Sequence, residues 1–109
     1  MIRGAAMDQK RAGEVVVGLK EGLHARPADR LAREARGWQS KVEVICRDQR
    51  VDGKSILDLL TLAAEEGTRL VIETTGPDAD EALAAIVRLF ETNFNEKSDA
   101  TVDAAGRSN

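Results

Sequence analysis

Hydrophobic residues change their spacing several times along the chain, and each change indicates a new element. Residues 14–19 are rich in valine, and apolar residues alternate along residues 41–46, so both segments predict strands. Between them, residues 25–36 have alanine and leucine at positions i, i+3, i+4 and i+7, which form one face of a helix. Gly37 follows directly and is expected to end that helix.

The middle of the chain predicts a short strand and a second helix. The strand is expected around residues 49–51, because the Asp52-Gly53 pair after it is a strong turn signal. The second helix is expected over residues 55–64, and Gly67 closes it.

A last strand and a third helix complete the pattern. Leu70 and Ile72 belong to an alternating run that indicates the strand, and residues 76–78 (Gly-Pro-Asp) break it. Asp78 is expected to cap the third helix, with Glu81 at the capping-box spacing. The apolar stripe of this helix consists of Leu83, Ile86, Val87 and Phe90.

The element order is therefore β-α-β-β-α-β-α, and the helices need the apolar face of a sheet. We expect an α+β fold, a two-layer open-faced sandwich with three helices on one face of a four-stranded, mainly antiparallel sheet. The folded domain is expected over residues 13–94, between a flexible lead-in over residues 1–12 and a disordered C-terminal tail over residues 95–109.

Composition narrows the possible functions. The chain has 109 residues, enough for one domain. Its aromatic residues are Trp38, Phe90 and Phe94, too few for a module that stacks bases on aromatic side chains. The net charge of −3 gives no general basis for binding nucleic acid or anionic membranes.

Cys46 is the one cysteine, so no internal disulfide can form, and we expect it to be a small buried hydrophobic residue. The chain has no apolar stretch long enough to cross a bilayer and no secretion leader, which favours a cytoplasmic protein. No cofactor is indicated, and we expect a monomer.

The only histidine, His24, lies within residues 22–27 (Gly-Leu-His-Ala-Arg-Pro), directly before the first helix. A neutral imidazole is a nucleophile and can carry a phosphoryl group as a covalent intermediate. The free backbone N–H groups of Ala25 and Arg26 would attract that anion, together with the helix dipole. Arg26 adds a permanent cation, and Pro27 lacks an N–H where none is required.

Other roles for His24 have less support. The chain offers no second histidine, cysteine pair or carboxylate cluster beside it, so a metal site is not expected. A serine hydrolase would need a nucleophile elbow, which is absent. A half-buried structural histidine at the helix start remains open from the residues alone.

Residues 22–28 resemble the phosphorylation motif of the HPr family, the histidine-containing phosphocarriers of the bacterial phosphoenolpyruvate-dependent phosphotransferase system (PTS). Residues 53–57 (Gly-Lys-Ser-Ile-Leu) are similar to the family's second signature, around its regulatory serine. Gly67-Thr68 and residues 76–78 also fall where the family has them, so the resemblance covers residues 13–94.

The resemblance implies a mechanism. His24 would accept a phosphoryl group on Nδ1 from the phosphohistidine of enzyme I and pass it to an acceptor of the IIA type. Arg26 would stabilise the phosphate during transfer. The protein would then be a carrier rather than an enzyme in its own right.

Ser55 has both a structural and a regulatory interpretation. Asp58 follows it by three residues, a spacing typical of a capping box, so the hydroxyl is expected to cap the second helix. The resemblance also makes Ser55 a candidate for phosphorylation by HPr kinase/phosphorylase. Asp52 and Asp58 would oppose the added charge.

The second helix has two apolar stripes, and only one can face the sheet. In the resembling family, enzyme I and its acceptors dock on the other stripe, beside the active histidine; burial under neighbouring helices is the alternative. Three arginines on one face of the first helix, Arg26, Arg30 and Arg33, would add a polar rim, unless they form an ordinary salt-paired surface. The predicted docking contacts are Ile56, Leu57, Leu60, Arg30 and Arg33.

Glu21 and Asp29 depart from the usual pattern of the resembling family, which has a neutral residue at the first position and a small one at the second. Both add negative charge near the expected phosphoryl site. They leave the chemistry of His24 intact but put the identity of the partners in doubt. An alternative function also remains, that of a nitrogen-branch or purely regulatory paralogue that signals metabolic state through His24 and Ser55.

Overall fold

A computed structural model describes residues 9–95 of the chain. Its element order confirms the predicted β-α-β-β-α-β-α arrangement, with a short 3₁₀ turn at the end. The elements are β1 (Lys10–Val16), α2 (Ala25–Arg36), β2 (Lys41–Cys46), β3 (Gln49–Asp52), α3 (Ile56–Thr61), β4 (Arg69–Thr75), α4 (Ala79–Glu91) and η1 (Asn93–Asn95).

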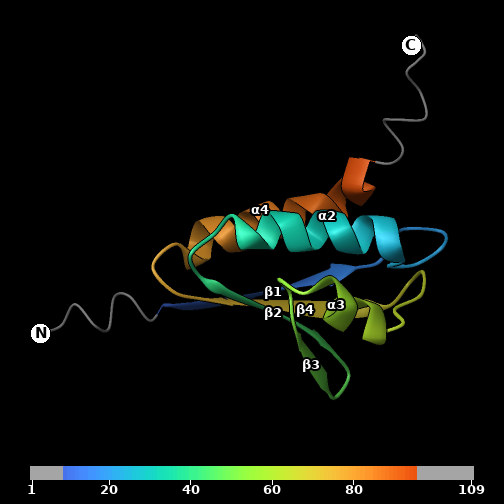
Figure 1. Cartoon of the computed structure of the whole chain (residues 1–109), viewed down its shortest axis with the longest axis horizontal. Coiled ribbons are helices and arrows are strands. Elements are labelled where there is room, and N and C mark those ends of the chain that lie inside the picture. The colour runs from blue at the N-terminus through green and yellow to red at the C-terminus, as the bar shows by residue number, and fades with distance from the viewer. Residues whose placement is uncertain (1–8, 96–109) are drawn as a thin grey trace, which may run out of the picture.

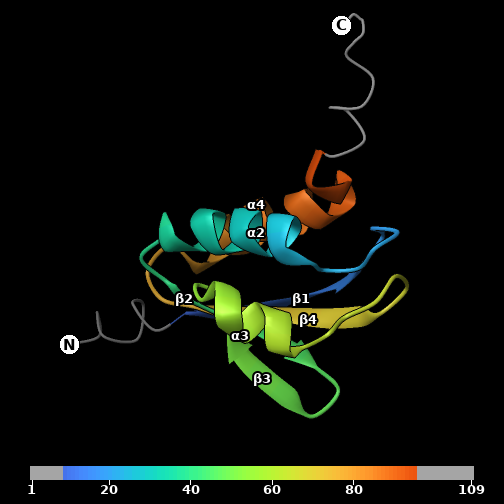
Figure 2. The same ribbon diagram turned by 45° about the vertical axis from the view of Figure 1, so that its right-hand side comes forward.

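The four strands form one sheet in the order β1-β4-β2-β3, and every pair is antiparallel. Helices α2 and α4 lie side by side over one face of this sheet (Figure 1). The short helix α3 packs against α2 and β3, as the turned view shows (Figure 2). The predicted open-faced two-layer sandwich is confirmed.

The layer between sheet and helices is aliphatic, as the scarcity of aromatic residues requires. Leu31 of α2, Leu59 of α3, Ile86 of α4 and Ile72 of β4 are completely buried. Each such side chain contributes about 1.5–3 kcal/mol through removal of its surface from water. Cys46 is a free thiol buried in the same core, as expected.

Charged residues occupy the opposite face of the sheet. Glu43 and Glu73 are directly paired across β2 and β4, which places two like charges side by side. Arg50 bridges both carboxylates, at 2.8 and 2.6 Å. The hydrogen bond from Arg50 lowers the pKa of Glu73, so this carboxylate stays ionised despite its neighbour.

The predicted bounds of the first strand were wrong. β1 begins at Lys10, so three of the twelve residues assigned to the lead-in belong to the sheet. Lys10 pairs with Thr75 and Ala12 with Glu73. Pairing with β4 therefore extends β1 into residues that have no hydrophobic pattern. The rest of the lead-in, residues 1–8, and residues 96–109 of the tail lie outside the described residues.

The second helix is shorter than predicted. It ends at Thr61 because Ala63 takes a left-handed backbone conformation, with φ of +48°. The chain turns there so that the carbonyl of Ala64 can accept a hydrogen bond of 2.9 Å from the N–H of Leu23. The end of α3 is thus determined by contact with the loop that precedes α2.

The predicted side-chain cap of α4 was also wrong. Asp78 is the N-cap residue, but its carboxylate makes no cap hydrogen bond. It accepts instead from the hydroxyl of Ser40 at 2.6 Å and from the N–H groups of Gln39 and Ser40 at 3.0 and 2.9 Å. These hydrogen bonds, the Ser40 hydroxyl first, lower the pKa of Asp78.

Candidate functional site

The loop between β1 and α2 is fastened to the segment before β4. The pairing of β1 with β4 continues into the loop through Val17, whose N–H donates to Thr68 and whose carbonyl accepts from Gly67. Farther along, Gly22 has φ of +76°, and a Cβ there would lie 2.5 Å from the carbonyl oxygen of Ala64. Only glycine fits this contact, so Gly22 positions the residues that follow it.

His24 is the N-cap residue of α2, with extended backbone angles of φ −84° and ψ −169°. Its N–H donates to Gly22 at 2.9 Å, and its carbonyl accepts from Ala28 at 3.0 Å. The backbone is therefore fixed on both sides, whereas the imidazole makes no cap hydrogen bond and is half-buried. The side chain that could react therefore does not cap the helix that follows it.

A shallow hollow of about 260 Å³ adjoins the imidazole. Arg26 lines it from the first turn of α2, and Lys20 and Glu21 line it from the loop. Within residues 9–95, neither Arg26 nor Lys20 is within 4.0 Å of a carboxylate, so both cations are available to an anion. The residues that line the hollow are Leu19, Lys20, Glu21, His24 and Arg26.

The first turn of α2 favours an anion beside His24. Ala25 and Arg26 are exposed, and no backbone carbonyl of the described chain accepts from their N–H groups. Pro27 is buried and has no N–H to leave unsatisfied. The first turn contains no acidic residue, so nothing within it opposes negative charge.

The structure separates the three arginines proposed as a rim. Arg26 lies in the hollow beside His24, as described above. Arg33 forms an ion pair with Asp29 at 3.2 Å, so its charge is partly neutralised. Arg30 lines a different hollow, between α2 and α4, together with Glu34 and Arg88.

Ser55 is the N-cap residue of α3, and its hydroxyl accepts from the N–H of Asp58 at 3.2 Å. The predicted cap is confirmed. The reciprocal half of a capping box is not formed, because the carboxylate of Asp58 accepts from the N–H of Asp52 at 3.3 Å. Unlike His24, Ser55 uses its side chain to hold its helix together.

The apolar stripe proposed for docking is only partly exposed. Leu57 is 75% exposed, one of the two most exposed large hydrophobic residues of the described chain. Ile56 and Leu60 are half-buried against the core, and Ala64, which continues the helical spacing of Leu57 and Leu60, is buried. Leu57 is therefore the member of the stripe with most surface to offer.

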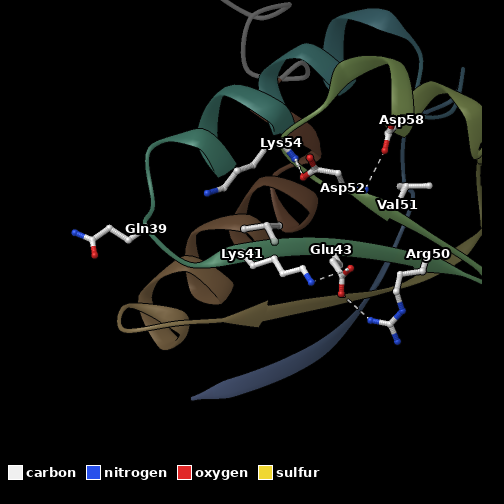
Figure 3. A pocket seen from close by; sticks show the side chains of 9 residues that line it. Gln39, Lys41, Glu43, Arg50, Val51, Asp52, Lys54 and Asp58 are labelled. Carbon is white, nitrogen blue, oxygen red and sulfur yellow. Dashed lines mark hydrogen bonds and ion pairs between the residues drawn. The ribbon is translucent and has the colours of Figure 1, made fainter. Parts of the chain in front are cut away.

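Figure 3 shows a second hollow, of about 540 Å³, beside the turn that precedes Ser55. Lys54 and Asp58, which flank Ser55, both line it, together with Asp52. The sequence did not indicate this hollow, nor the place of Lys20 beside His24. The hollow depends on how β3 and the start of α3 lie beside β2. The place of Lys20 depends on how the loop before α2 is fastened to the segment before β4.

No metal centre or membrane segment is found in the described part. Among residues 9–95, no three side chains of His, Cys, Asp or Glu gather closely enough to hold a metal ion. In the same range, no helix has the length and the apolar character needed to span a bilayer.

Comparisons with known proteins agree on one family. The family model described as "PTS HPr component phosphorylation site" matches residues 12–92. Phosphocarrier protein HPr of Neisseria meningitidis is 43% identical over 77 residues, which cover 71% of this chain and 86% of that protein. The multiphosphoryl transfer protein of Xanthomonas campestris is 34% identical over 96 residues, which are 87% of this chain and 12% of that one.

The solved structures point the same way. The crystal structure of HPr from Thermoanaerobacter tengcongensis aligns with a TM-score of 0.76 and 31% identity, over 79% of this chain and 97% of that one.

Proposed function

Because the chain belongs to the HPr family, the phosphocarrier proteins of the PTS, we propose that His24 is the residue that carries the phosphoryl group. The observation that supports this most directly is the contrast at His24 itself. Its backbone is bonded on both sides, while its imidazole has no cap hydrogen bond and adjoins a hollow. A carrier needs a nucleophile that is positioned but not engaged.

In the proposed step, Nδ1 of neutral His24 attacks the phosphorus of a phosphohistidine on enzyme I. The new N–P bond forms as the N–P bond to the donor imidazole breaks, and the donor keeps the bonding electron pair. A second transfer then moves the phosphoryl group from His24 to an acceptor of the IIA type and returns His24 to its neutral state. The protein gains and loses one phosphoryl group and is unchanged over the cycle.

Arg26 and the N–H groups of Ala25 and Arg26 are proposed to stabilise the phosphoryl oxygens. The guanidinium is exposed in the same hollow as His24 and can form two parallel hydrogen bonds. The N–H groups at the start of a twelve-residue helix add fixed dipoles. Such groups favour the charge that develops during transfer without burying it.

The proposed partners are enzyme I and IIA-type acceptors, met in the cytoplasm by a monomeric carrier. The name of the Xanthomonas relative, multiphosphoryl transfer protein, fits a relay of several phosphoryl carriers. Leu57 would supply the exposed apolar contact, and weak docking suits a carrier that must leave quickly. The proposed docking contacts remain Ile56, Leu57, Leu60, Arg30 and Arg33.

Ser55 is proposed as a regulatory site for HPr kinase/phosphorylase. It is half-buried, and it lies next to Ile56 and Leu57 of the proposed docking surface. A phosphate at this position would place about two negative charges beside those contacts. A purely regulatory paralogue is the alternative, but the relatives are named as phosphocarriers, which supports transfer.

The test of the carrier role is phosphorylation of the full chain with phosphoenolpyruvate and enzyme I from the same genome. Wild type should gain acid-labile, base-stable phosphate at one residue, and His24→Ala should gain none. Ser55→Ala is the matched control and should be labelled like wild type. Acid-labile phosphate on the His24→Ala variant would assign the carrier role to another residue.

A further inference from the structure

Two contacts join the turn before α3 to the last residue of α2 and to the segment just after that helix. Arg36, the last residue of α2, donates from Nη1 to the carbonyl oxygen of Lys54 at 3.2 Å. Lys54 in turn donates from Nζ to the carbonyl oxygen of Trp38 at 2.9 Å. Neither contact was indicated by the sequence, and together they hold two cations where the chain enters Ser55.

We infer that Arg36 is the basic group that receives a phosphate on Ser55, an inference that rests on the regulatory role proposed above for that serine. The carbonyl that Arg36 contacts belongs to the peptide unit that Lys54 shares with Ser55. The guanidinium is therefore one peptide unit away from the backbone of the modified residue. This role requires only that a change of side-chain rotamer bring the guanidinium from this carbonyl to a phosphate oxygen on the neighbouring residue.

Arg36 has the capacity for this second partner. It is exposed, and no carboxylate of residues 9–95 lies within 4.0 Å of its guanidinium. Of the five N–H donors in its planar fork, the contact with Lys54 uses one. A neutral carbonyl is a weaker partner than a phosphate dianion, so the phosphate would win the competition.

The charges around the turn make a cation necessary. Asp52 and Asp58 flank Ser55, and both are held in place by backbone N–H groups of the turn, from Lys54 and Asp52 respectively (Figure 3). Before modification these two carboxylates balance Arg36 and Lys54. A phosphate adds about two negative charges to that group, and Lys54 is already directed at Trp38.

The arrangement explains how the modification could act at a distance from the reacting histidine. Helix α2 is twelve residues long, with His24 as its N-cap residue and Arg36 as its last residue. A phosphate held by Arg36 stays at the contact between α2 and α3, beside Ile56 and Leu57. It would therefore change the docking surface while the hollow at His24 keeps its shape.

The experiment installs phosphoserine at position 55 of the full chain during translation, so that no kinase is needed. Thermal unfolding is measured for the modified and unmodified forms of wild type, Arg36→Gln and the control Arg69→Gln. Arg69 is exposed on the open face of the sheet, 3.9 Å from Glu14. Arg36→Gln should lower the Tm of the phosphorylated form by about 5 °C more than that of the unmodified form.

Arg69→Gln should lower both forms equally, and Arg36→Lys should retain part of the coupling. High salt should shrink the coupling at Arg36. Equal Tm losses for the two forms of Arg36→Gln would overturn the inference, as would equal coupling at Arg69, which would indicate net charge alone. Because phosphoserine is installed directly, either result is independent of whether His24 carries phosphate.

Discussion

Helices α2 and α3 both begin after a polar N-cap residue, but the side chains of the two N-cap residues are used differently. His24 and Ser55 are both N-cap residues with extended backbones. The Ser55 hydroxyl accepts a hydrogen bond from its own helix, whereas the His24 imidazole does not. The residue proposed to carry the phosphoryl group therefore has a side chain without a cap hydrogen bond, and the backbone around it supplies the rigidity.

The largest effect is expected from breaking the support of the His24 loop. In Gly22→Ala, the new Cβ would lie 2.5 Å from the carbonyl oxygen of Ala64, at a backbone φ of +76°. We expect a loss of about 3 kcal/mol in the free energy of unfolding, measured in urea, from left-handed strain and overpacking together.

Gly67→Ala is the matched control for this prediction. Gly67 also has a positive φ, of +89°, but a Cβ there would meet nothing within 4 Å. It should lose only about 1 kcal/mol, because strain acts alone. If the two variants lost the same stability, the contact with Ala64 would not be what holds the loop.

The next effect concerns the charge beside His24. Arg26→Gln should lower the rate of phosphoryl transfer from enzyme I about tenfold, or about 1.4 kcal/mol of transition-state stabilisation, with Tm unchanged. Arg33→Gln, whose guanidinium is already paired with Asp29, should lower it no more than about threefold. Rapid-quench kinetics with labelled enzyme I measures both, and equal losses would refute a special role for Arg26.

Measuring both stability and phosphoryl transfer for a variant of each N-cap residue sharpens the comparison further. Ser55→Ala should cost about 1 kcal/mol of stability, the usual loss for an N-cap, while transfer through His24 stays within about twofold of wild type. His24→Ala should abolish transfer and leave the urea midpoint nearly unchanged. A large loss of stability in His24→Ala would mean that the imidazole has a structural role as well.

The smallest effect is a pH dependence at the third helix start. The pKa of Asp78 is lowered by the Ser40 hydroxyl, so this carboxylate stabilises the fold at neutral pH and loses that contribution as pH falls below its ordinary range. Asp78→Asn should therefore unfold at a lower temperature than wild type at pH 7, with a gap that narrows toward pH 3. Calorimetry at both pH values measures it, and a constant gap would contradict the assignment.

These contrasts also indicate what the sequence could predict. The bounds of α2 were predicted correctly because its alanine and leucine stripe and Gly37 are local signals. The start of β1 at Lys10 was not, because it depends on pairing with Thr75 of β4, a strand that is distant in the sequence. Asp78 is of a residue type that often caps helices, yet the hydrogen bond from Ser40 determines where its carboxylate lies.

The candidate site divides in the same way. His24, Arg26 and Ser55 lie in two short motifs, so residue type and spacing were enough to single them out. Lys20 in the His24 hollow and Arg36 beside Lys54 belong to no motif. They are brought to their places by the packing of a loop and a helix end, which local patterns do not describe.

The direction of β1 has a consequence for joining this domain to others. The strand starts at Lys10, beside Thr75, and runs for seven residues, about 23 Å, toward the loop that carries His24 (Figure 1). A fusion partner, an affinity tag or a surface anchor placed ahead of β1 would therefore hang from the end of the sheet remote from the histidine. The proposed phosphoryl site would remain accessible to other proteins, so the fold suits tethered designs as well as free carriers.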